Sequence, residues 1–122
     1  MKPINPTGHS YSMGYSINAP AKIVFISGQV PETEDGFVPV SFYDQCKLVW
    51  QNIEQQVMKA DMKLTDIAKI TVFLSDRKYR EENALVRREI FGDHQPALTV
   101  IIAGIYEEKW LLEIEVIASS VV

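Results

Sequence analysis

The sequence has a single cysteine, no long apolar run and no excess of positive charge, and each of these absences excludes a class of protein. Cys46 cannot form an internal disulfide, so we expect a cytoplasmic protein in which Cys46 is an ordinary helix residue. No apolar run approaches the length of a membrane span, and residues 1–14 lack the apolar core of a signal peptide. A net charge of −4 at pH 7, with scattered lysines and arginines, is not typical of a nucleic-acid-binding protein. We therefore expect neither a membrane nor a nucleic acid as a partner.

Motifs for metals, cofactors and common nucleophiles are also missing. His9 and His94 are far apart in the chain, and no cysteine or carboxylate lies at a metal-ligand spacing from either. The sequence contains no glycine-rich phosphate loop and no serine nucleophile elbow. We predict no metal and no cofactor.

The size and composition indicate one globular domain that spans residues 1–122. With 47% apolar and 23% charged residues, the composition is ordinary for such a domain. A chain of 122 residues can form a core, but it is close to the size at which association often completes the burial of apolar surface.

Hydrophobic periodicity predicts an α+β fold in the order two strands, a helix, a strand, a helix and two strands. The predicted elements are an extended arm over 1–10, strands over 11–17 and 23–26, a helix after Ser41, a strand over 68–74, a helix over 79–91 and strands over 97–103 and 110–118. The continuous apolar run at 23–26 predicts a strand covered on both faces. Asp61 tolerates the left-handed conformation and is expected to end the first helix, and Gly92 the second. Both helices are expected on one face of the sheet.

The last strand combines an apolar face with an unusual acidic one. Period-2 geometry places Leu112, Ile114, Val116 and Ala118 on one face, and Leu111, Glu113, Glu115 and Ile117 on the other. Carboxylates between apolar side chains fit a wet cleft or a subunit interface, whereas a solvent-exposed edge strand is the simpler alternative. Because both helices cover the same face, burial of the other face against copies of the chain is the simplest way to shelter its apolar residues.

Four segments carry a resemblance to a known family. They are ISGQVP at 26–31, KITVFLSD at 69–76, PALT at 96–99 and WLLEIEVIA at 110–118. Their sequence and order over nearly the whole chain resemble the Rid family, also called the YjgF or L-PSP family. The resemblance implies a chorismate mutase-like fold, a homotrimer and small-molecule clefts between subunits. It also implies hydrolysis of reactive enamines and imines, such as 2-aminoacrylate, to 2-keto acids and ammonia.

The resemblance also assigns site residues. Glu113 matches the glutamate that orients water, and Tyr11 matches the tyrosine of the first strand, although Tyr15 is near enough to compete. These two are the implied catalytic residues. Ser27 and Gly28 match the serine-glycine element that contributes to substrate binding.

One position departs from the pattern that the resemblance implies. Members of the family that deaminate 2-aminoacrylate carry an arginine after Pro-Ala. This chain has Leu98 at that position, followed by Thr99. The resemblance implies that both positions bind the substrate. An arginine holds a carboxylate through charge-assisted hydrogen bonds that leucine cannot make. We therefore expect no useful deamination of 2-aminoacrylate. Arg80, Arg87 and Arg88 are most simply the solvated face of the second helix, and the alternative is that one of them replaces the missing cation.

Two functions remain open from the sequence. The cleft either hydrolyses a C=N or related bond, with Glu113 as the water-positioning base, or only binds a metabolite or a partner while Glu113 forms hydrogen bonds within the interface. Ribonuclease or translation-inhibitor activity, a third possibility attached to the family's name, is disfavoured by the acidic balance.

Overall fold

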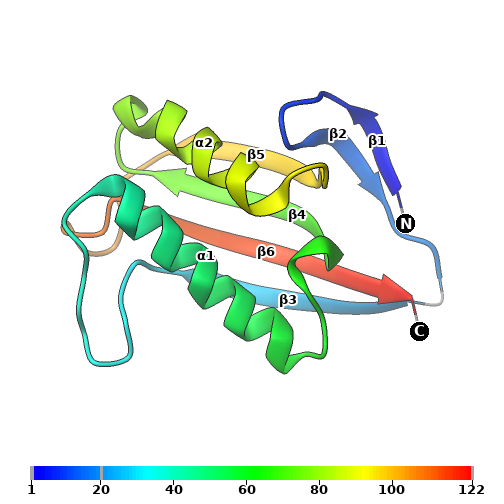
Figure 1. The fold of residues 1–122 in the computed structure, drawn as a ribbon, viewed down its shortest axis with the longest axis horizontal. Coiled ribbons are helices and arrows are strands. Elements are labelled where there is room, and N and C mark those ends of the chain that lie inside the picture. The colour runs from blue at the N-terminus through cyan, green and yellow to red at the C-terminus, as the bar shows by residue number, and fades with distance from the viewer. Residues whose placement is uncertain (1, 20, 122) are drawn as a thin grey trace.

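The computed structural model describes residues 2–19 and 21–121, which form one mixed sheet with two helices on one face (Figure 1). The strands lie in the order β1-β2-β5-β4-β6-β3. They are β1 Lys2–Pro6, β2 Ser12–Ser16, β3 Ala21–Gln29, β4 Ile67–Leu74, β5 Ala97–Ile102 and β6 Leu112–Val121. The helices are α1 Phe42–Lys59 and α2 Arg80–Phe91. A short 3-10 turn, η1 Leu64–Asp66, precedes β4, and a second, η2 Arg77–Tyr79, precedes α2. The predicted α+β class and the placement of both helices on one face are confirmed.

Helix α1 begins and ends where its sequence predicts. The hydroxyl of Ser41 accepts a hydrogen bond from the backbone N–H of Asp44 at 3.1 Å, which satisfies one of the free donors of the first turn. Asp61 follows the helix with φ of 60°, the left-handed conformation expected there. The helix buries a continuous stripe that includes Trp50. Neither helix in the described part of the chain is long and apolar enough to span a membrane.

Strand β6 has the two faces predicted for it. Leu112, Ile114 and Val116 are buried beneath the helices, in register with Leu74, Val72 and Ile70 of β4. Glu113 and Glu115 point to the opposite face, in register with Phe73 and Thr71. That opposite face is covered by no helix or strand among the described residues, and we call it the open face (Figure 1).

The amino-terminal segment differs from the expected extended arm. Residues Lys2–Pro6 form β1, which pairs antiparallel with β2 at the edge of the sheet. The prolines of this segment favour an irregular arm over a regular element. An edge strand tolerates proline, however, because the missing N–H faces away from the partner strand. The pairing with β2 is a tertiary contact that local composition does not reveal.

The prediction that the apolar run at 23–26 is covered on both faces is wrong for the single chain. Strand β3 lies at the other edge of the sheet, and α1 covers only one of its faces. On the open face Phe25 is 76% exposed and Ile23 is 49% exposed. An apolar edge strand of this kind is a surface that association with another chain would bury.

Candidate functional site

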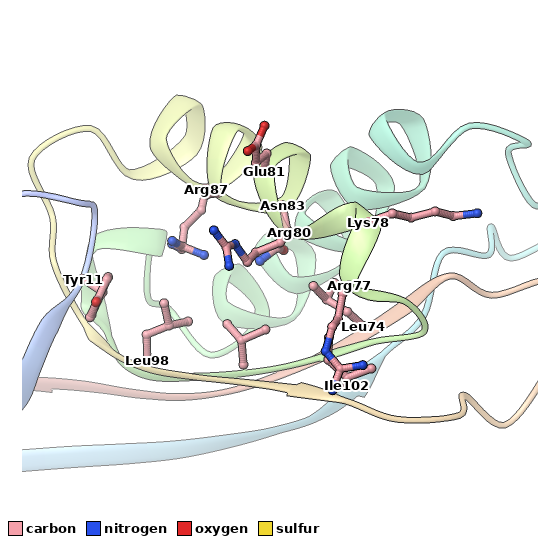
Figure 2. A pocket seen from close by; sticks show the side chains of 12 residues that line it. Tyr11, Leu74, Arg77, Lys78, Arg80, Glu81, Asn83, Arg87, Leu98 and Ile102 are labelled. Carbon is pink, nitrogen blue, oxygen red and sulfur yellow. The ribbon is translucent and has the colours of Figure 1, made fainter.

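A cavity of about 790 Å³ lies between α2 and β5, on the helix-covered side of the sheet (Figure 2). Side chains from four parts of the chain contribute to it: Tyr11 before β2, Leu74 at the end of β4, residues of η2 and α2, and the apolar side chains of β5. Its volume is in the range typical of sites for small organic ligands. The cavity is therefore the first candidate for a binding site.

Tyr11 is placed by the turn that joins β1 to β2. The backbone N–H of Thr7 and its hydroxyl both donate hydrogen bonds to the Tyr11 carbonyl, at 3.1 and 2.8 Å. Tyr11 lines the cavity, whereas Tyr15 packs edge-on against the ring of His94 with 6.0 Å between the ring centroids. Of the two tyrosines considered from the sequence, the fold brings Tyr11 to this cavity.

Strand β5 forms the apolar wall opposite α2. Leu98, Val100 and Ile102 share one face of the strand and line the cavity. Thr99 points to the other face, where its hydroxyl accepts a hydrogen bond from Lys69 Nζ at 2.6 Å. The two positions predicted to bind substrate, Leu98 and Thr99, therefore lie on opposite faces of the sheet, and only Leu98 contributes to the cavity.

Arg87 departs from the expectation that the arginines of the second helix form a solvated face. It is only 5% exposed and lines the cavity from α2, while Arg88 next to it is exposed. Burial, with a smaller contribution from Arg88, lowers the pKa of the Arg87 guanidinium. The signal was present in the helical spacing, because Arg87 lies four residues after the buried Asn83 and beside Val86 on the inward stripe. The type of residue, rather than its position, suggested exposure.

Cys46 lies in the core behind the cavity, in contact with one of the residues that line it. Asn83 lines the cavity, and the Sγ of the buried Cys46 lies 3.9 Å from Asn83 Oδ1. Burial raises the pKa of the Cys46 thiol to about 12. The thiol is therefore protonated at neutral pH, and Cys46 is a core residue rather than a nucleophile.

The predicted residues Glu113 and Gly28 meet at a second place, on the open face. The register of β3 against β6 shifts between Ile26 and Gln29, which indicates a β-bulge at Ser27 and Gly28. A Cβ atom on Gly28 would lie 1.9 Å from Glu113 Oε2. Gly28 thus permits a close approach of the carboxylate, and a larger residue would displace it. Ser27 is exposed beside it.

The predicted site residues therefore form two groups within one chain. Tyr11 and Leu98 lie at the cavity beneath α2, whereas Ser27, Gly28 and Glu113 lie at the bulge of the opposite face. The sheet separates the two groups, so a single chain does not bring them together.

Neither group of predicted site residues takes part in an ion pair within the described residues. The ion pair found there joins Lys109 Nζ and Glu32 Oε1 at 3.9 Å, and it involves neither Glu113 nor Arg87. No group of three or more His, Cys, Asp or Glu side chains is placed to hold a metal ion within the described ranges.

A family model described as Endoribonuclease L-PSP matches residues 4–120 of the chain. Among curated proteins, the chain is 32% identical to the protein MMF1, mitochondrial, of Saccharomyces cerevisiae over 114 residues, which cover 93% of this chain and 77% of the yeast protein. It is also 32% identical over 100 residues to an Escherichia coli protein named "Putative reactive intermediate deaminase TdcF", with 79% of this chain and 78% of that protein covered.

Comparison with solved structures also finds proteins of this family. The crystal structure of yeast Mmf1 matches with a TM-score of 0.75 at 32% identity, over 96% of this chain and 90% of the yeast chain. The structure of E. coli TdcF with bound serine matches with a TM-score of 0.76 at 28% identity, over 98% of this chain and 91% of the other. A Rid-family protein of unknown function from Yersinia pestis, only 16% identical, has a TM-score of 0.82 over 96% of both chains, and this likeness concerns the fold alone.

Proposed function

Because this chain belongs to the endoribonuclease L-PSP family, also called the Rid or YjgF family, we propose that it is a homotrimeric hydrolase that cleaves the C=N bond of a small imine or enamine. The main support for this proposal is that Glu113 lies directly beside Gly28 on the open face, where the glycine leaves room for a carboxylate. A relative named as a reactive intermediate deaminase supports the type of reaction. The relative with bound serine supports a small organic substrate.

The open face supports the assembly. Phe25, Ile23 and Ile101 are large apolar side chains exposed on this face, and Phe25 is the most exposed of the three. Apolar patches on a sheet edge are stable in water when another subunit covers them. Since Glu113 and Glu115 interrupt the patch, its burial leaves a hydrated polar pocket within the interface rather than a dry core.

Assembly also resolves the separation of the two groups of site residues. We place the cleft where the cavity lined by Tyr11 and Leu98 in one subunit meets Glu113 of the partner subunit. An active site shared in this way explains why one chain contains two half-sites on opposite faces of its sheet. It also explains why the cavity in the single chain has an apolar wall and a tyrosine but no acid directed into it.

The proposed reaction uses Glu113 as the base. An enamine first takes up a proton from solvent at carbon and becomes an iminium ion. Glu113 then accepts a proton from water while the water oxygen forms a bond to the iminium carbon, which gives a neutral carbinolamine. Glu113 returns its proton to the nitrogen, the C–N bond breaks as ammonia leaves, and the hydroxyl releases its proton to solvent so that a carbonyl remains. A positioned base of this kind contributes roughly 10²- to 10⁴-fold to the rate, and the Tyr11 hydroxyl polarises the substrate by hydrogen bonding.

Ammonia release from a panel of imines and enamines tests this proposal. We expect turnover by the wild-type protein, a loss on the order of 100-fold in Glu113→Gln, and no change in Glu115→Gln. Glu115 is the matched control because it lies on the same face of β6 but is exposed and does not contact Gly28. Equal turnover by wild type and Glu113→Gln, or no turnover of any substrate by the wild type, contradicts the proposal.

The competing function is a trimer that only binds a metabolite, with Glu113 serving the interface. The similarity to a protein named as a reactive intermediate deaminase favours the hydrolase over this alternative. We do not propose ribonuclease activity, because the net charge of −4 disfavours binding to a phosphate backbone.

A further inference from the structure

Arg87 is a charged side chain that is buried without a carboxylate partner in the described residues. It is 5% exposed, and its Nε atom has no hydrogen-bond partner in the structure. A buried charge without a partner costs free energy, so such groups are rare unless something else compensates them. Its guanidinium extends from α2 toward the cavity rather than back to the surface (Figure 2). A group that compensates this charge therefore has to approach from the cavity side.

The other charges at the cavity do not supply it. Arg77 and Arg80 also line the cavity, so the local charge is positive. Glu81 is the acid among the lining residues, and its side chain points away from the cavity over the outer side of α2 (Figure 2). The space beneath α2 thus combines a buried cation, further cations and no inward-facing carboxylate among the described residues.

The opposite wall has a different character. Leu98, Val100 and Ile102 present only carbon atoms to the cavity from β5. A ligand that fills this space meets a guanidinium on one side and aliphatic side chains on the other. Its own chemistry must match both walls.

We propose that Arg87 anchors a binding site for a small organic monocarboxylate, whose apolar body lies against Leu98 and Val100. Guanidinium binds carboxylate through two parallel charge-assisted hydrogen bonds, and the terminal nitrogens of Arg87, which point into the cavity, are the donors available for them (Figure 2). Arg77 and Arg80 are exposed to water, whereas Arg87 is buried, and a single buried positive charge is matched by a monocarboxylate better than by a phosphate dianion. An anion at this position would also offset the desolvation that lowers the pKa of Arg87.

The cavity size and the apolar wall favour an acid with a branched or aromatic body. A three-carbon acid such as 2-aminoacrylate would fill little of about 790 Å³. The claim that this acid is the substrate of the hydrolase rests on the proposed function. The binding of the anion by Arg87 does not depend on turnover.

Stability separates a ligand-binding role from a structural one. Methionine has a similar length to arginine and suits an apolar cavity, so Arg87→Met removes an unpaired buried charge while the packing is largely kept. If Arg87 serves the ligand, the variant is as stable as the wild type or more stable, and only binding is lost. If Arg87 holds the fold together, Arg87→Met lowers the melting temperature, and this outcome overturns the proposal.

The decisive experiment is calorimetric titration of the assembled protein with butyrate, hexanoate and benzoate, and with benzamide as the uncharged counterpart of benzoate. We expect benzoate to bind most tightly and benzamide at least tenfold more weakly. Arg87→Met is expected to weaken benzoate binding on the order of 10- to 100-fold, with partial recovery in Arg87→Lys. Arg88→Met is the matched control because Arg88 is the exposed neighbour on the same helix, and it should bind as the wild type does.

The outcomes distinguish this inference from the proposed hydrolase. Wild-type protein that binds none of the carboxylates, or an Arg87→Met variant that binds benzoate as tightly as the wild type, overturns the anion site whatever the turnover. Benzoate binding that depends on Arg87, in a protein that releases no ammonia from any imine, supports the anion site while the hydrolase fails. We expect Glu113→Gln to keep benzoate binding and to lose turnover.

Discussion

The substitution Gly28→Ala tests the half-site on the open face with a single methyl group. The added Cβ would lie 1.9 Å from Glu113 Oε2 and 2.8 Å from Glu113 Cδ, and real Cβ atoms essentially never approach closer than 3.0 Å. The carboxylate must therefore move by more than about 1 Å. A displacement of this size at a reacting group costs on the order of 100-fold in rate. We expect turnover of an imine substrate to fall by about that factor.

Stability should change little in the same variant. The contact is made by the end of a flexible, half-buried side chain that can rotate away, and alanine restricts the unfolded chain more than glycine does. The two effects oppose each other, so we expect a change in unfolding free energy within about 1 kcal/mol. Ammonia release and thermal unfolding, measured side by side, separate a lost base from a damaged fold.

Gly104→Ala is the matched control for this experiment. A Cβ at Gly104 meets nothing within 4 Å, so this variant should keep both turnover and stability. Gly28→Ala with wild-type turnover would refute the role assigned to the Glu113–Gly28 contact. Equal loss in both glycine variants would also refute it.

The remaining predictions concern the cavity wall, the open face and the core thiol. Wild-type protein should release no measurable ammonia from freshly generated 2-aminoacrylate, whereas Leu98→Arg combined with Arg87→Met, which removes the like charge from the same cavity, should gain that activity; an active wild type contradicts the importance of Leu98. Phe25→Glu, on the open face, should dissociate the assembly in light-scattering measurements, while Met58→Glu should not, because Met58 is also apolar and exposed but lies on α1. An intact Phe25→Glu assembly would show that the open face is not the interface. Because burial raises the pKa of Cys46 to about 12, native protein should resist iodoacetamide at mildly alkaline pH and react only after denaturation, and rapid alkylation of the native thiol would be inconsistent with that burial.

The parts of the fold that follow local patterns were predictable from the sequence. The start of α1 at Ser41 and the left-handed turn at Asp61 are properties of a few neighbouring residues. The two faces of β6 follow from strict alternation, which assigns Glu113 to the face opposite Leu112 without knowledge of any partner strand.

The features that depend on distant partners were not predictable in this way. The pairing of β1 with β2 and the edge position of β3 are set by tertiary contacts that no local pattern encodes. Arg87 illustrates a different limit. Its spacing placed it on the buried stripe, but a charged residue type ordinarily argues for exposure, and only the cavity beneath α2 accounts for the exception. The relation between the two half-sites depends on an assembly that one chain does not contain.

The most direct measurement of the central claim is the mass of the purified protein in dilute solution, determined by sedimentation equilibrium. The account places the acidic open face of β6 within an interface between copies, so it predicts a single species of three times the 13.8 kDa chain mass. A protein that sediments at the mass of one chain would leave Glu113 and Phe25 in bulk water, and it would contradict both the shared cleft and the site built on it.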